Sequence, residues 1–156
     1  MFKIAICDDE KAICQQLNNL IINIGEETGE IFQIHEFNSG EELYDSLEKG
    51  NQYELIFLDI ELREISGVEV GRRIREELED HVTQIVYISG TDSYAMELFD
   101  VRPLNFLIKP LEPRKIEYVL STARKILQSS NQLFEYKIGN VNCYVMLKDV
   151  LYFESK

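Results

Sequence analysis

The sequence predicts an α/β domain in which a doubly wound, five-stranded parallel sheet is covered by helices on both faces. Short apolar runs alternate five times with helical patterns over residues 1–127, which is typical of βαβ units joined by right-handed crossovers. Residues 55–58 are apolar at every position, as expected of a strand buried on both faces. A shorter, β-rich tail follows this domain.

The expected strands and helices follow one another in a regular order. Each strand is a short run rich in β-branched or aromatic residues, and each helix carries apolar residues three and four positions apart. Ser39 and Glu42 match a capping box at the start of the second helix. The helical pattern is weakest at residues 94–99. The expected strands are 3–7, 31–37, 55–58, 84–88 and 105–108, and the expected helices are 13–24, 40–49, 68–78, 94–99 and 113–127.

The C-terminal part of the chain differs in character. Residues 128–132 are polar and lack periodicity, which suits a linker. Short strand-like runs follow, and Gly139 with Asn140 suits a two-residue hairpin turn between the first two. We therefore expect a domain at 1–127, a linker at 128–132 and a β-rich domain start at 133–156.

Composition excludes several classes of function. A net charge of -12 argues against a broad basic surface for nucleic acid. No apolar run reaches the roughly 18 residues of a membrane span, and no secretion signal opens the chain, so we expect a cytoplasmic protein without a membrane partner. Cys7, Cys14 and Cys143 form no CxxC pair, which fits a reducing compartment. With only His35 and His81, a zinc site is not expected.

Polar residues stand at the ends of four of the expected strands. Asp8 and Asp9 follow the first strand, Asp59 the third, Ser89 the fourth and Lys109 the fifth. Each has an ordinary explanation, such as a helix cap or an exposed loop residue. Because ligands of open α/β sheets bind at the carboxyl ends of the strands, the four endings together favour one site.

Three carboxylates at one sheet edge would repel one another and require a cation. Mg²⁺, which prefers oxygen ligands, suits this set, and one dication with the Lys109 ammonium balances the three negative charges. The Asp59 carboxylate could then attack a phosphoryl group in line. Mg²⁺, Lys109 and the Ser89 hydroxyl would stabilise the charge on the transferring oxygens, and the product would be an acyl phosphate.

These motifs, in this order, resemble the receiver domain of two-component response regulators. The resemblance rests on the acidic pair Asp8-Asp9, on Asp59, on Ser89 followed by Gly90, and on Phe106 three residues before Lys109-Pro110, and it covers about residues 1–127. It implies the flavodoxin-like strand order 2-1-3-4-5.

The resemblance implies a role for each site residue. Asp59 would be the phosphoacceptor, with Asp8, Asp9, Asp59 and the backbone carbonyl of Glu61 as the Mg²⁺ ligands. Lys109, joined to Pro110 by a cis peptide bond, would contact the phosphoryl group.

The resemblance also implies a switch and its partners. Ser89 and Phe106 would change position on phosphorylation, while Glu61 and Thr91 would tune dephosphorylation. The donor would be a phosphohistidine of a sensor histidine kinase. The domain would catalyse its own phosphoryl transfer without turning over a substrate. A homodimer would form through the face of helix four, strand five and helix five.

The C-terminal segment resembles the start of a LytTR-type DNA-binding domain. This match rests on residues 149–155, and the loop at 59–62 is similar to that of LytTR regulators. Arg63 and Glu64 stand where those regulators usually carry Pro-Gly. The resemblance implies a transcription regulator with a truncated output domain, which would contact DNA only through the missing part.

Two other functions compete with the receiver interpretation. A haloacid-dehalogenase-type phosphatase also combines a nucleophilic Asp with Ser, Lys and Mg²⁺, but its nucleophile follows the first strand in a DxD pattern. Neither Asp8-Asp9 nor Asp59-Ile60-Glu61 supplies that pattern. A phosphorylation-independent interaction module would carry the same pocket without being labelled by a phosphodonor.

Overall fold

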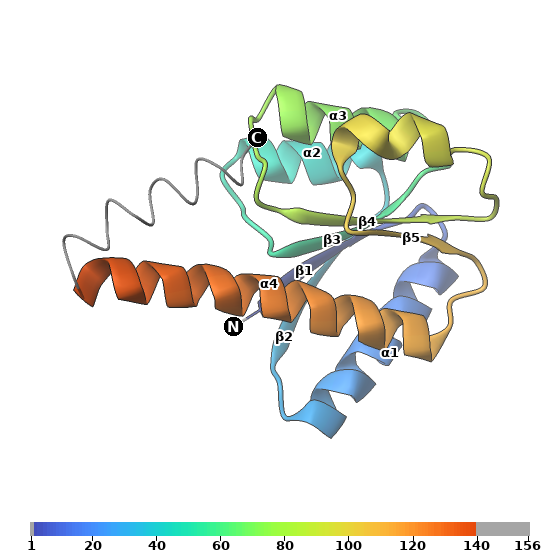
Figure 1. The fold of residues 1–156 in the computed structure, drawn as a ribbon. Coiled ribbons are helices and arrows are strands. Elements are labelled where there is room, and N and C mark those ends of the chain that lie inside the picture. The colour runs from blue at the N-terminus through green and yellow to red at the C-terminus, as the bar shows by residue number, and fades with distance from the viewer. Residues whose placement is uncertain (1, 140–156) are drawn as a thin grey trace. The chain divides into compact units, whose positions relative to one another are not determined.

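The computed structural model describes residues 2–139 and contains one five-stranded, fully parallel sheet in the order β2-β1-β3-β4-β5 (Figure 1). This is the fold class and strand order expected from the sequence. The chain divides into two units, Met1–Leu120 and Ser121–Lys156, and the sheet lies in the first. The strands are β1 (Phe2–Cys7), β2 (Phe32–Phe37), β3 (Leu55–Asp59), β4 (Gln84–Ser89) and β5 (Asn105–Ile108).

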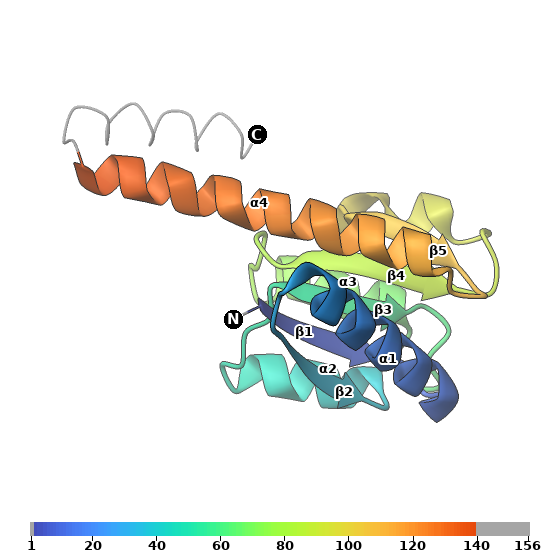
Figure 2. The ribbon, with the colours of Figure 1, turned by 90° about the horizontal axis from the view of Figure 1, so that it is seen from below.

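Helices cover both faces of the sheet. Figure 1 shows α2, α3 and the 3₁₀ helix η1 on one face and α1 with the start of α4 on the other. Seen from below, in Figure 2, α1 lies in front of the strands. No helix among the described residues is long and apolar enough to cross a membrane. The helices are α1 (Lys11–Thr28), α2 (Gly40–Glu48), α3 (Gly67–Glu76), η1 (Ala95–Val101) and α4 (Pro113–Gly139).

Strand β3 is the centre of the sheet, and all five of its residues are buried. It pairs with β1 on one side and β4 on the other, with Cys7 opposite Leu58 and Asp59 opposite Ile88. Burial on both faces of the sheet explains why all residues of β3 before Asp59 are apolar. The register brings the carboxyl ends of β1, β3 and β4 to the same edge.

The helix ends follow the local chemistry of the sequence. The Ser39 hydroxyl accepts a hydrogen bond from the Glu42 N–H at 3.1 Å, and the Glu42 carboxylate accepts one from the Asn38 N–H at 3.2 Å. The expected cap is therefore present, with Glu42 reaching one residue further back. Helix α1 ends at Gly29, whose φ of 76° lies in the left-handed region that glycine tolerates best.

The segment expected as the fourth helix is a 3₁₀ helix, η1, instead of an α-helix. Only seven residues belong to it, and it ends at Arg102, which has a φ of 56° and precedes Pro103. A residue before proline is disfavoured in the α conformation. Leu98 and Val101 are buried, whereas Met96 and Phe99 are exposed, so only part of the apolar surface of this segment is covered.

Helix α4 continues to Gly139, where we expected a linker at 128–132 and then a strand. That part of the expectation is wrong. No glycine or proline occurs from Arg114 to Ile138, so nothing in the local sequence ends the helix. The hairpin turn at Asn140 and the later strand-like runs lie outside the described residues, and the domain limits remain a prediction.

Candidate functional site

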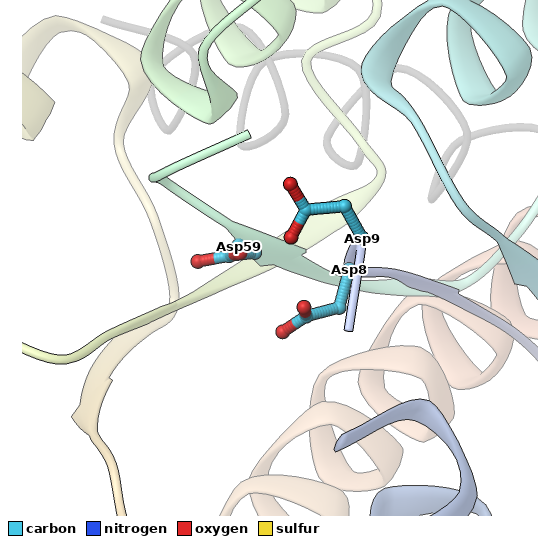
Figure 3. A group of neighbouring side chains, drawn as sticks. All are labelled: Asp8, Asp9 and Asp59. Atoms are coloured by element: carbon cyan, nitrogen blue, oxygen red, sulfur yellow. The ribbon is translucent and has the colours of Figure 1, made fainter. Parts of the chain in front are cut away.

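Three carboxylates meet at the edge of the sheet where β1 and β3 end. Oxygens of Asp8, Asp9 and Asp59 all lie within 4.8 Å of one another (Figure 3). Asp8 is 1% exposed and Asp59 is 2% exposed, while Asp9 is half-buried. The structure thus brings together the acids that the sequence placed at separate strand ends.

Lys109 supplies the cation of this cluster. Its Nζ lies 3.2 Å from Asp8 Oδ2 and 3.8 Å from both Asp59 Oδ1 and Glu10 Oε1. Its backbone N–H donates to the Ser89 carbonyl at 2.7 Å, and its peptide bond to Pro110 is cis. The end of β5 is therefore held beside the end of β4, with the ammonium aimed at the acids.

Burial makes Asp8 and Asp59 reluctant to ionise, which raises the pKa of both carboxyl groups. Burial first, and then the charge of Asp8, raise the pKa of Asp59 to about 6, although Lys109 opposes the shift. Burial also raises the pKa of Asp8. For Lys109 burial disfavours the charge, but Asp59 and Asp8 outweigh it and raise the pKa of the ammonium. One ammonium is not enough to offset three acids.

The donor set fits a hard divalent cation. Asp8 Oδ1 accepts a hydrogen bond from the Glu10 N–H at 2.8 Å, whereas the buried Asp8 Oδ2 has no hydrogen-bond partner among the described residues. Lys109 Nζ lies 3.2 Å from that oxygen and pairs with its charge. A buried carboxylate oxygen without a hydrogen bond is costly, and Mg²⁺ prefers such oxygen ligands. The N-cap of α1 is Glu10, so neither Asp8 nor Asp9 is that cap.

The loop after Asp59 is folded back onto β3. The Glu61 N–H donates to Asp59 Oδ1 at 3.2 Å, and the Gly67 N–H donates to the Ile60 carbonyl at 2.9 Å. A Cβ on Gly67 would collide with the backbone of Asp59, so this close approach requires glycine. The buried hydroxyl of Tyr87 donates to the Gly67 carbonyl at 3.2 Å, which fixes the end of the loop from β4.

Ser89 is fully buried, and its hydroxyl is held by Glu61. The Ser89 Oγ donates to Glu61 Oε1 at 3.0 Å, and the Gly90 N–H donates to the same oxygen at 3.3 Å. The Thr91 N–H in turn donates to Ser89 Oγ at 3.2 Å. Sequence reasoning assigned Glu61 and Ser89 separate roles and missed this contact, because its only signal is an acidic residue two positions after Asp59.

Two further residues complete the surroundings of the site. Phe106 is half-buried in β5, opposite Tyr87, and packs against the core. Arg63, from the loop after β3, brings its Nε to 3.5 Å from Asp9 Oδ2 although its side chain is 86% exposed. The sequence singled out Arg63 only as a departure from Pro-Gly and did not predict a second cation at the site.

Curated relatives of the chain include bacterial regulators that are longer than it is. The chain is 27% identical over 126 residues to the sensory transduction protein LytT of Oceanobacillus iheyensis, covering 81% of this chain and 49% of that protein. It is 30% identical over 124 residues to the transcriptional regulatory protein LytR of Staphylococcus aureus, covering 78% and 47%. The chain thus spans about half the length of these relatives.

Solved structures agree with the fold. The response regulatory domain of protein mrkE from Klebsiella pneumoniae is similar at 26% identity and a TM-score of 0.67, covering 84% of this chain and 99% of that one. A CheY-like receiver domain protein from Methanospirillum hungatei shares the fold at 17% identity and a TM-score of 0.70, covering 83% and 98%.

The family comparison matches most of the same region. The model of the response regulator receiver domain matches residues 4–121. This range includes β2 to β5, all of β1 except its first two residues, and the whole carboxylate cluster. With the fold and the site in agreement, the chain belongs to the response regulator receiver domain family.

Proposed function

We propose that this chain is the phosphorylation-controlled switch of a two-component system and that Asp59 is its phosphoacceptor. The observation that carries the proposal is the setting of Asp59, a buried carboxylate within 4.8 Å of Asp8 and Asp9. Lys109 Nζ lies 3.8 Å from it. The donor in this proposal is a phosphohistidine of a sensor histidine kinase, and we place the exchange in the cytoplasm.

The site residues supply positioning and charge for the transfer. An ionised Asp59 oxygen forms the new bond to phosphorus as the bond between phosphorus and the donor imidazole breaks. The Lys109 ammonium is placed to contact the phosphoryl oxygens and to stabilise their negative charge during the transfer. Asp8, Asp9, Asp59 and the Glu61 carbonyl would hold Mg²⁺, which when bound neutralises charge on the carboxylates and the transferring oxygens.

The acyl phosphate would then act on the neighbouring strands. Phosphorylation adds about -1.5 to -2 charges, and the Ser89 hydroxyl, at the end of β4, would donate a hydrogen bond to a phosphoryl oxygen. Movement of Ser89 would free space toward β5, where Phe106 is half-buried. These movements would shift the face formed by η1, β5 and the start of α4 toward its active arrangement. Exposed Phe99, Ile108 and Tyr118 lie on these elements, which supports a homodimer through this face.

Signal termination and output follow from the same proposal. The domain has no turnover substrate, and water removes the phosphoryl group slowly, at a rate tuned by Glu61 and Thr91. LytR is named a transcriptional regulatory protein, which supports a transcriptional output for this chain. With a net charge of -12, the receiver itself is poorly suited to bind DNA, so DNA binding would belong to a LytTR-type output domain.

The test is labelling by a small-molecule phosphodonor such as acetyl phosphate. In the presence of Mg²⁺, the intact mass of the chain should rise by one phosphoryl group, and EDTA should prevent the change. Asp59→Asn should abolish labelling, whereas Asp45→Asn, at an exposed aspartate of α2, should leave it unchanged. Labelling that persists in Asp59→Asn, or that never occurs, contradicts the proposal. Turnover of p-nitrophenyl phosphate would favour a phosphatase instead.

A further inference from the structure

The Ser89 hydroxyl, which the proposed function makes part of the switch, is engaged by the Glu61 carboxylate. We propose that the Glu61 side chain is a latch that holds the Ser89 hydroxyl in its resting position and releases it when Asp59 is phosphorylated. This inference rests on the proposed function. It assigns Glu61 a positioning role in the resting protein, separate from any effect on dephosphorylation.

The one hydroxyl proton of Ser89 is already used in a hydrogen bond. A hydroxyl has one proton to donate, and Ser89 Oγ donates it to Glu61 Oε1 at 3.0 Å. An oxygen lone pair of Ser89 is occupied by the Thr91 N–H at 3.2 Å. As long as this arrangement lasts, Ser89 has no proton to offer a phosphoryl oxygen. Release from Glu61 therefore has to precede or accompany the switch.

Glu61 also holds the backbone of the same loop. The Gly90 N–H donates to Glu61 Oε1 at 3.3 Å, so one carboxylate oxygen ties both Ser89 and Gly90 to the loop after β3. Hydrogen bonds to a charged acceptor contribute more than hydrogen bonds between neutral groups. The latch is therefore strong enough to affect where the end of β4 rests.

Phosphorylation acts on Glu61 through charge. Glu61 lies two residues after Asp59, and its N–H donates to Asp59 Oδ1 at 3.2 Å. No residue in the described range forms a salt bridge with the Glu61 carboxylate, so no side-chain cation there holds it in place. A dianionic phosphoryl group on Asp59 repels this carboxylate and competes with it for the Ser89 proton. The same event therefore weakens the latch and supplies the new acceptor.

The released side chain has space to move into. A hollow of about 560 Å³ adjoins Glu61, between the loop after β3 and η1. Glu61 itself is exposed, so its side chain can turn away without disturbing the core. The other residues lining the hollow are Ile60, Leu62, Ser66, Val68, Tyr94 and Glu97.

The test measures how tightly the full chain binds beryllofluoride, a phosphoryl mimic, with Mg²⁺. NMR titrations would follow the backbone amides of Ser89 and Gly90 and the ring of Phe106. Glu61→Ala should bind beryllofluoride roughly three- to tenfold more tightly than the unmodified chain, which corresponds to the loss of one hydrogen bond. Glu61→Gln keeps an acceptor but loses the charge, so its affinity should fall in between.

Two further variants separate the latch from a general charge effect. In a Ser89→Ala background, Glu61→Ala should change the affinity far less, because the latch is already absent. Glu97→Ala, at an exposed residue lining the same hollow, should behave like the unmodified chain. In the absence of beryllofluoride, Glu61→Ala should shift the Ser89 and Gly90 amides toward their bound positions. A role confined to dephosphorylation would move none of these readouts.

The outcomes distinguish a failure of the latch from a failure of the proposed function. If the unmodified chain binds beryllofluoride and is labelled at Asp59, but Glu61→Ala has the same affinity and resting spectrum, the latch is refuted and the proposed function stands. Equal effects of Glu61→Ala with and without Ser89 also refute the latch. If the unmodified chain neither binds beryllofluoride nor is labelled, the proposed function fails and the latch fails with it.

Discussion

Ionisation of Asp59 is disfavoured in the folded domain. Burial, followed by the charge of Asp8, raises its pKa to about 6 from the ordinary 3.8. An acid with a higher pKa in the folded state binds its proton more tightly there than in the unfolded chain. Its contribution to stability is therefore fully present below about pH 3.8, is lost as the pH rises through this window, and is absent above about pH 6.

Replacing Asp59 by Asn should therefore stabilise the metal-free chain at neutral pH. We expect Asp59→Asn to raise the free energy of unfolding at pH 7.5 in EDTA by a value on the order of 1 kcal/mol. This gain corresponds to a melting temperature higher by several degrees. At pH 5, where Asp59 is largely protonated, the gain should shrink. Thermal melts of both proteins at the two pH values measure this, with Asp45→Asn as the exposed control. An Asp59→Asn chain that melts lower at pH 7.5 would contradict the assigned pKa shift.

Arg63 is the second residue whose charge can be tested on its own. Its Nε lies 3.5 Å from Asp9 Oδ2, so the guanidinium and a metal ion would compete for the same carboxylate. Arg63→Gln should bind Mg²⁺ roughly two- to fivefold more tightly in calorimetric titrations at low salt, because one repelling charge is removed. Arg63→Lys, which keeps the charge, should resemble the unmodified chain. Weaker Mg²⁺ binding by Arg63→Gln would show that Arg63 supports the site.

At the scale of elements, α3 lies unusually close to β3 and β4. Gly67 and Gly71 make this approach possible, since a Cβ at Gly67 would collide with Asp59 and one at Gly71 with the Tyr87 hydroxyl. Tyr87 is fully buried and donates to the Gly67 carbonyl. Arg75, also buried, donates from α3 to the Val101 carbonyl at 2.7 Å. Helix α3 thus positions both the loop after Asp59 and the end of η1.

This packing predicts a specific pair of substitutions. Gly71→Ala should lower the free energy of unfolding by about 1–3 kcal/mol, the usual cost of overpacking. Adding Tyr87→Phe should recover part of that loss, because the hydroxyl is the atom nearest the new methyl group. Tyr87→Phe alone should cost about 1 kcal/mol through the lost hydrogen bond. Denaturant titrations of the four proteins give the coupling, and strictly additive effects would contradict the predicted contact.

At the scale of the whole molecule, excess negative charge and the carboxylate cluster act together. The chain carries a net charge of -12, and its three clustered acids face a single lysine and one exposed arginine. A dication that binds only the folded domain stabilises it by linkage, about 2.7 kcal/mol at a hundred times the dissociation constant. Metal binding is thus expected to be visible in global stability.

Adding Mg²⁺ at pH 7.5 should therefore raise the melting temperature in a concentration-dependent way, and EDTA should reverse the effect. Asp9→Asn should reduce the response strongly, because Asp9 is a half-buried member of the cluster. The matched control is Asp92→Asn, at an exposed aspartate of the loop after β4. A melting temperature that does not depend on Mg²⁺ would argue against a metal site at Asp8, Asp9 and Asp59.

The sequence by itself determined the layered α/β fold, the strand order through its resemblance, and the meeting of Asp8, Asp59 and Lys109 at one edge. Apolar periodicity is local information, and parallel strands necessarily bring their carboxyl ends to the same side. The sequence did not predict the 3₁₀ form of η1, because helical periodicity alone does not show how much apolar surface a helix can bury.

Only the tertiary structure decided which side chains at that edge engage one another. Ser89 and Glu61 are separated by 28 positions, and their hydrogen bond depends on loop path and rotamer, which no sequence pattern encodes. The same holds for Arg63 beside Asp9. The pattern of strands predicts which residues lie at this edge of the sheet. Which of their charged and polar groups are in contact depends on distances that only the folded chain defines.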